Sequence, residues 1–311
     1  MKKQLLTLSL FALALAVSFT ACKIDTSSGN TTSLETEATT HSDDDSRVSN
    51  EIDAVANDGS TVLETNAAFS GKGQGVQSLI CDATVAVDTV SNPRTITITY
   101  NGTNCLGTRT RTGVVIISMP QNTRWKDAGA TITVTYQNLK ITRVSDNKSI
   151  TINGSHTFTN QSGGLLINLP TLGTITHLIN STGMTITFDN GSQRSWQVAR
   201  KHVFTYNNGV VLTISGNHTE GNVTNIAEWG TNRFGGAFTT ATVDPIVIRQ
   251  DCNGRITAGQ VKHTTPNVTA NVTFGLDSSG NPTTCPGLGS YYLKLVWTGP
   301  GGNTHTSILP Y

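Results

Sequence analysis

Apolar and polar residues alternate in one segment after another from about residue 79 to the C-terminus. Two clear examples are Thr95 to Tyr100 and Thr131 to Tyr136, in which isoleucine or valine stands between threonines. Successive side chains of a β-strand point to opposite faces of a sheet, so this period of two predicts strands with one buried and one solvated face. The pattern favours an all-β protein.

Turn-forming residues separate these segments, as at Asn101-Gly102, Asn153-Gly154 and Asn207-Asn208-Gly209. Such turns join antiparallel strands, whereas parallel strands need helical crossovers, for which this region has no pattern. We therefore expect an antiparallel meander that forms a β-sandwich or one large, curled sheet. An outer-membrane barrel is disfavoured because only 6% of the residues are aromatic, too few for two interfacial girdles.

The N-terminus has the layout of an export signal. Lys2 and Lys3 precede an apolar run that ends at Thr20-Ala21-Cys22. A cysteine in that place is typical of bacterial lipoproteins, so residues 1–21 are expected to be a signal peptide and Cys22 the lipid-carrying residue; an ordinary signal peptide is the alternative. Lys23 stands where inner-membrane lipoproteins often carry aspartate, which favours the outer membrane and leaves the leaflet open.

Residues 22–66 are polar and acidic, and we expect a disordered tether there. Between 23 and 66 there are ten acids and two bases, whereas residues 67–311 hold seventeen bases and ten acids. Val48, Ile52 and Val55 are nevertheless at helical spacing, which predicts one short amphipathic helix behind a Ser46 cap. The remainder, 67–311, is expected to be the β domain, and its moderate positive charge calls for no nucleic-acid partner.

Four further cysteines are expected to form two disulfides, because their number is even and the chain is exported. We favour Cys81 with Cys105 and Cys252 with Cys285, since each pair brackets a strand pair that ends in a Gly/Asn loop. The two brackets indicate a weak internal duplication. No pair has the short spacing of a zinc knuckle, so no metal and no cofactor is expected.

One stretch resembles a known family. The segment Arg109-Thr110-Arg111-Thr112-Gly113 before an apolar strand, followed by Trp125-Lys126-Asp127-Ala128-Gly129, is similar to an uncharacterised family of Gram-negative outer-membrane lipoproteins. The resemblance implies lipoprotein status and an all-β fold, and it brings no catalytic residues. Thr99-Tyr100-Asn101 departs from the acidic, aromatic strand end of that family.

Hydrolase signatures are missing from the sequence. There is no Gly-x-Ser-x-Gly elbow and no histidine pair at zincin spacing. An envelope hydrolase would require converging acids, for which Glu220 and Glu228, in the irregular segment 216–234, are the first candidates. The expectation is therefore that the protein is not an enzyme.

The sequence favours an interaction or structural module of the cell envelope, anchored in the membrane by lipid and directed at another envelope protein. The alternative is a surface lipoprotein that binds an acidic glycan or another anion through exposed aromatic and basic side chains. The residues nominated for such binding are Arg111, Arg124, Trp125, Lys126 and Trp229.

Overall fold

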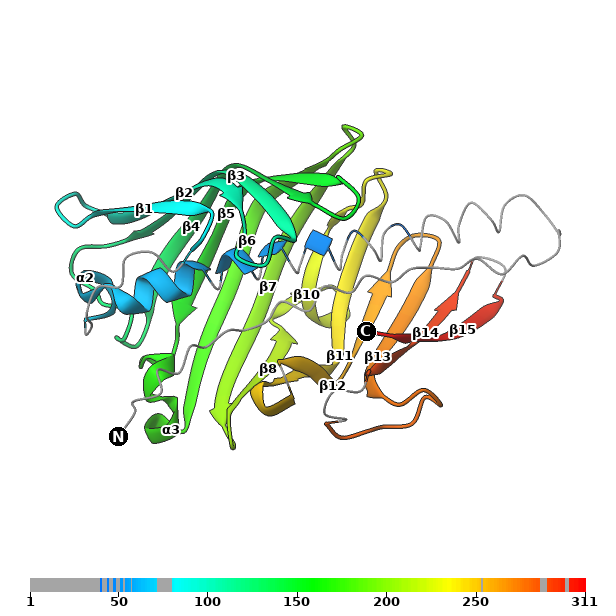
Figure 1. Cartoon of the computed structure of the whole chain (residues 1–311). Coiled ribbons are helices and arrows are strands. Elements are labelled where there is room, and N and C mark those ends of the chain that lie inside the picture. The colour runs from blue at the N-terminus through cyan, green and yellow to red at the C-terminus, as the bar shows by residue number, and fades with distance from the viewer. Residues whose placement is uncertain are drawn as a thin grey trace.

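The structure is a computed structural model of the whole chain (Figure 1). It describes residues 40, 44, 47–48, 51–52, 54–56, 58–71, 80–252, 254–285, 290–299 and 302–311. Cys22 and the signal peptide lie outside the described residues. No helix among the described residues is long and apolar enough to cross a membrane.

In the part of the chain that the structure describes, fifteen antiparallel strands form a single sheet. The all-β prediction is therefore confirmed, and the architecture is the curled sheet rather than the sandwich. The first eight strands are β1 (Ala83–Asp88), β2 (Arg94–Thr103), β3 (Arg109–Met119), β4 (Ala130–Arg143), β5 (Ser149–Asn160), β6 (Thr174–Phe188), β7 (Gln193–Tyr206) and β8 (Val210–Gly216). The others are β9 (His218–Glu220), β10 (Val223–Thr231), β11 (Ala237–Arg249), β12 (Arg255–Thr264), β13 (Thr269–Leu276), β14 (Tyr292–Thr298) and β15 (Thr304–Pro310). Short helices are α2 (Ala67–Ser70), η1 (Leu166–Asn168), α3 (Leu169–Leu172) and η2 (Gln250–Cys252).

Burial follows the period of two seen in the sequence. In β2, Ile96, Ile98 and Tyr100 are buried, while the threonines between them are partly or fully exposed. Because β2 alternates in this way along most of its length, one face of the sheet is the core and the other faces water. We call the core side the inner face and the opposite side the outer face.

A line of β-bulges runs across β3, β4, β5 and β6. Glycine stands at several of these positions because the strands approach closely: a Cβ on Gly113 would lie 2.4 Å from the carbonyl oxygen of Asn138. A Cβ on Gly154 would lie 2.9 Å from the Cα of Met184. Bulges bend and twist a strand, so this line curls the sheet around its inner face.

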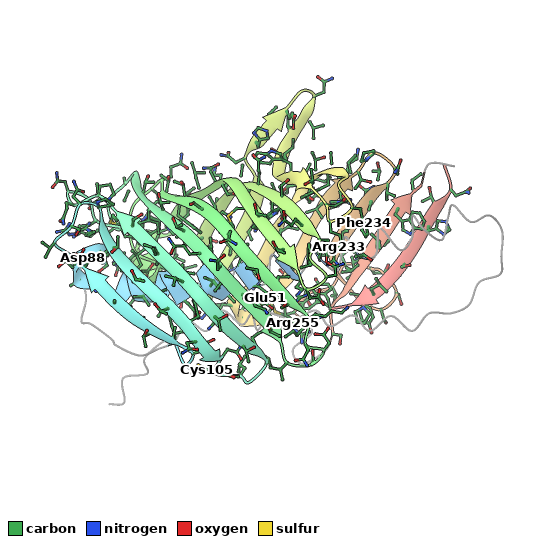
Figure 2. All side chains as sticks on the ribbon, turned by 90° about the horizontal axis from the view of Figure 1, so that it is seen from above. Glu51, Asp88, Cys105, Arg233, Phe234 and Arg255 are labelled. Atoms are coloured by element: carbon green, nitrogen blue, oxygen red, sulfur yellow. A yellow bond between two sulfur atoms is a disulfide. The ribbon has the colours of Figure 1, made fainter. Side chains whose placement is uncertain are left out.

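Two strands share one position in the sheet. β8 pairs with the C-terminal halves of β7 and β11, and β10 pairs with their other halves. Between β8 and β10 the chain leaves the sheet as a hairpin, residues 217–225, which is almost wholly exposed and projects from the sheet in Figure 2. Gly216 permits this exit, because a Cβ there would lie 1.9 Å from the Asn225 oxygen.

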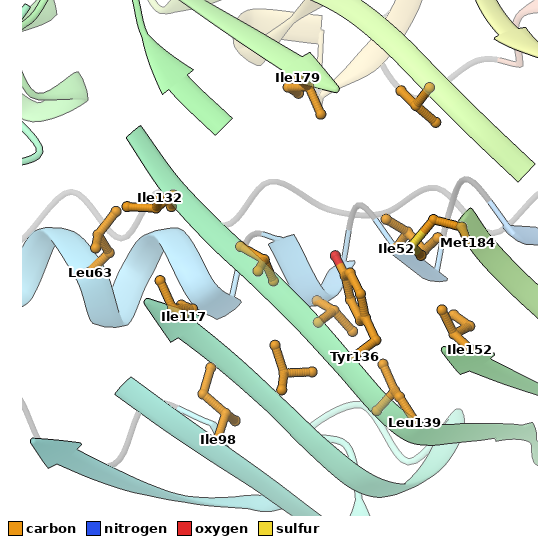
Figure 3. Close-up of a cluster of buried hydrophobic side chains, with 14 of the residues drawn as sticks. Ile52, Leu63, Ile98, Ile117, Ile132, Tyr136, Leu139, Ile152, Ile179 and Met184 are labelled. Carbon is orange, nitrogen blue, oxygen red and sulfur yellow. The ribbon is translucent and has the colours of Figure 1, made fainter. Parts of the chain in front are cut away.

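The inner face of β2 to β7 is covered by a helical segment that ends at residue 65, just before α2 (Figure 1). Its apolar side chains Val48, Ile52, Val55 and Leu63 are each at most 4% exposed and belong to the main core. Figure 3 shows Ile52 and Leu63 among the apolar side chains of the strands. The expected helix is thus present, but Asp44 is already helical, so the helix begins before the Ser46 cap that the sequence predicted. The expectation of a tether up to residue 66 also needs correction, because the described residues between 44 and 65 form a helical segment on the sheet.

Both disulfides have the expected pairing, with Cα–Cα distances of 5.2 Å for Cys81–Cys105 and 5.3 Å for Cys252–Cys285. In each disulfide, the first cysteine lies just before a pair of hairpin strands and the second lies in the loop after that pair. The first bracket holds β1 and β2, and the second holds β12 and β13. The two bonds therefore occupy corresponding places near the two ends of the sheet.

Candidate functional site

Among its described residues, the helical segment has three ion pairs that hold it on the inner face. Asp44, Glu51 and Asp58 are seven residues apart, a spacing that keeps side chains on one side of a helix. Asp44 and Glu51 are buried, and Figure 2 shows Glu51 over the middle of the sheet. The partners of these carboxylates are Arg233 at the β10–β11 turn and Arg109 and Arg111 on β3.

Arg111, a nominated ligand-binding residue, is engaged inside the fold. Its Nη1 donates to Asp58 Oδ2 at 2.8 Å, and its Nε and Nη2 donate to the two carboxylate oxygens of Asp82 at 2.6 Å. The guanidinium also lies over the Tyr100 ring, 4.4 Å from its centroid. Burial raises the pKa of Asp58, with Arg111 opposing that rise. Arg111 therefore joins the helical segment to the sheet and has no free face for a ligand.

Trp125 is a core residue. It is 4% exposed, its backbone N–H donates to the Phe69 carbonyl at 2.8 Å, and its ring lies 5.1 Å from the His177 ring. A sugar ring needs an open aromatic face, so stacking on Trp125 is ruled out in this conformation. The sequence placed Trp125 in a loop between two cations. Its burial comes from contacts with α2, with Asn160 of β5 and with His177 of β6, which are all distant from it in the sequence.

Arg124 and Lys126 lie where the sequence put them, on the surface beside Trp125. Both flank Gly71 at the end of α2, and Lys126 Nζ lies 3.5 Å from the Gly71 oxygen. The structure adds Arg94, which is 2% exposed and lies over the Phe69 ring. Arg94 Nη2 donates to the Thr123 carbonyl, and no carboxylate among the described residues is paired with this guanidinium. Burial and the neighbouring Arg124 lower the pKa of Arg94. We call Arg94, Arg124 and Lys126 the basic corner.

Trp229 lies at the foot of the projecting hairpin and is half-buried. The His218 ring stacks on it at 4.2 Å between centroids, nearly parallel. One face of Trp229 is thus covered by the chain itself. Glu220, at the tip of the same hairpin, is exposed.

Glu228 points to the inner face and is 6% exposed. It accepts a hydrogen bond from Trp196 Nε1 at 2.6 Å, forms an ion pair with Arg200, and lies 4.0 Å from Arg194. The sequence indicated Glu228 as a candidate but not its grouping with Arg194, Arg200 and Trp196, because cross-strand neighbours leave no local spacing signal. Since Glu220 and Glu228 lie in an exposed hairpin and a buried cluster respectively, they do not form a pair of converging acids.

Among the described residues, one group of three His, Cys, Asp or Glu side chains has its ligand atoms within 4.8 Å of one another: Asp251, Cys252 and Cys285. The two cysteines are joined in a disulfide, so their sulfur atoms are not thiolate ligands. This group therefore offers a single carboxylate and carries no metal-binding argument.

Comparison with known proteins gives no identification. No family model, no curated protein and no solved structure matches the chain.

Proposed function

We propose that the protein is a lipid-anchored, non-catalytic module of the outer membrane that binds another envelope protein through the open edge of its sheet. The observation that supports this proposal is edge strand β15. Among the described residues, β15 pairs with β14 alone, and six of its seven residues are exposed. Its other side offers backbone N–H and C=O groups to an added strand.

Natural proteins usually protect such an edge with charged residues, bulges or a covering loop. Residues 302–311 contain no Asp, Glu, Lys or Arg, and the register between β14 and β15 is continuous. Pro310 has no backbone N–H to donate to an added strand, but it is the last residue of β15, so the rest of the edge can still pair. An edge of this kind favours strand addition by a protein partner.

The contacts of the candidate site residues support a non-catalytic role. Glu228 is neutralised by Arg200, Arg111 is bound to two aspartates, and Trp125 is buried. These contacts organise the sheet and its helix, which is the use expected of a structural module. The membrane anchor in the proposal rests on the sequence around Cys22, and Cys22→Ser should abolish both acyl labelling and membrane association.

The edge is tested by placing a photo-cross-linking amino acid at Thr306 in the full chain, in the native cell. We expect a discrete adduct with one protein, which disappears when Ser307→Pro is introduced because proline cannot donate to a ladder. The matched control has the photo-cross-linker at Thr84, an exposed position of the opposite edge strand β1. Equal adducts at both edges, or none at Thr306, would contradict the proposal.

The basic corner favours a second candidate function, the binding of an acidic glycan or another anion. Arg94 is a buried charge without a carboxylate, and a bound anion would compensate it. Sulfated oligosaccharide is the probe: Lys126→Ala should weaken its binding several-fold, whereas Lys201→Ala on the outer face should not. If both lysine variants bind alike, the corner is no anion site.

A further inference from the structure

Three polar side chains lie in a row across β5, β6 and β7 on the inner face. The register sets Asn160 opposite His177, and His177 opposite His202. Directly opposed residues of antiparallel strands have Cβ atoms about 4.5–5.5 Å apart. Side chains as long as imidazole and carboxamide can therefore converge on one small ligand. We call these three residues the Asn-His-His row.

Each member of the row has one buried polar atom without a hydrogen-bond partner in the described structure: Asn160 Oδ1, His177 Nε2 and His202 Nε2. The amide of Asn160 is fixed, because its Nδ2 donates to the Trp125 and Gly164 carbonyls, both at 2.8 Å. Its Oδ1 is thus the atom left over. An unsatisfied buried polar atom costs about 1–3 kcal/mol, so three neighbours of this kind indicate a bound species.

The donors are suited to a transition metal. The Nε2 atoms of His177 and His202 are both buried, and burial favours the neutral imidazole that can bind a metal. Neutral imidazole nitrogen is a preferred ligand of zinc, copper and nickel, whereas calcium and magnesium prefer sets of oxygen atoms. The nearby Arg200 does not forbid a cation, because its charge is paired with Glu228.

An apolar shell borders the row. Leu169, Ile175, Phe204 and Leu212 form a second core cluster, and the Phe204 ring stands edge-on to His177 at 5.1 Å. Such a shell orients the ligands and limits solvent access to a bound ion. His177 itself remains 8% exposed.

We propose that Asn160, His177 and His202 form a binding site for a late first-row transition-metal ion, held by two imidazole nitrogens and one amide oxygen. Among these ions Cu²⁺ binds nitrogen donors most strongly, and it is the probe of choice. Three protein donors leave a coordination position open to a further ligand. The sequence gives no local signal for this site, because its three residues lie on three neighbouring strands and are brought together only by the register.

The test is a Cu²⁺ titration of the untagged, full-length chain in the presence of glycine, which suppresses weak surface binding. We expect one ion per chain and an electron paramagnetic resonance spectrum with hyperfine coupling to two imidazole nitrogens. His177→Gln and His202→Gln should each weaken binding at least tenfold. The matched control is His305→Gln, at an exposed histidine on edge strand β15, which should bind as the parent does.

Circular dichroism and thermal unfolding of the copper-free variants establish that they fold. If the variants do not fold, the spectrum of the unsubstituted protein with copper is the test. Hyperfine coupling to fewer than two imidazole nitrogens in that spectrum overturns the proposal. Binding that is no tighter than that of glycine, or that survives both histidine substitutions, also overturns it. In that case the row holds an ordered water, which can bridge two to four polar atoms.

Discussion

Buried charge is the main theme at the scale of single residues. Glu228 stands between Arg200 and Arg194, with the Trp196 indole donating to it. Removing one partner of a buried charge cluster leaves the others uncompensated, which typically costs about 3–5 kcal/mol. We therefore expect Glu228→Ala to lower the free energy of unfolding by that amount, measured by urea denaturation. Glu220→Ala, on the exposed hairpin, is the control and should change it by less than about 0.5 kcal/mol.

Buried histidines make stability depend on pH. Desolvation lowers the pKa of His156 to about 3, below the ordinary value of 6.5. Between pH 6.5 and pH 3, His156 is therefore protonated in the unfolded chain but neutral in the folded chain. Its contribution to the free energy of unfolding is complete above pH 6.5 and is lost as the pH falls toward 3. Each such histidine adds up to about 1.4 kcal/mol per pH unit within that window.

We expect the free energy of unfolding, measured with a chelator present, to fall between pH 6.5 and pH 5, and the slope to be smaller in His156→Gln. His305→Gln, at an exposed histidine, should leave the slope unchanged. Glu64 acts in the opposite sense, because burial raises its pKa to about 7. Its contribution is complete below pH 4.5 and is lost as the pH rises through 7.

At the scale of elements, the helical segment decides whether the inner face is covered. Ile52 is 4% exposed in the main core. An aspartate there would bury an unpaired carboxylate, so Ile52→Asp should detach the segment rather than distort the sheet. Limited proteolysis should then cut within 44–65 while the strands remain protected, and dye binding should report the uncovered apolar face. Ser60→Asp, at an exposed position of the same segment, should leave the cleavage pattern as it is.

The same segment shows how far a sequence leads. The spacing of Val48, Ile52 and Val55 predicted a helix, yet the acidic composition around it suggested a tether. The composition misled because the carboxylates at 44, 51 and 58 are neutralised by arginines on strands far along the chain. The regular interval between these acids was the available signal. Trp125 and Arg111 were misjudged for a related reason: burial is set by which element packs on a loop, and local sequence does not record that.

At the scale of the whole molecule, the strands, the antiparallel order and the disulfide pairing were predictable, because alternation, turns and bracketing are local patterns. The choice between one sheet and two was not predictable. It depends on the line of bulges across β3 to β6 and on the helical segment that packs against the inner face of the curled sheet. The shared position of β8 and β10 was equally hidden. To predict it, one would have to recognise from the sequence that β8 and β10 lie end to end between β7 and β11, although the projecting hairpin separates them along the chain.

A single sheet with two edges needs its ends held, and each disulfide holds one hairpin near an end. Cys81–Cys105 closes a loop of 24 residues and ties down β1, the first edge strand. Loops of this length contribute about 3 kcal/mol when closed by a disulfide, mainly through the unfolded state. The double variant Cys81→Ala with Cys105→Ala should therefore lose about 2–4 kcal/mol, and hydrogen exchange should rise first in β1. The matched variant Cys252→Ala with Cys285→Ala should lose a similar amount but raise exchange in β12 and β13. If either pair of substitutions raised exchange uniformly through all fifteen strands, the two ends of the sheet would be one cooperative unit and not two separately fastened hairpins.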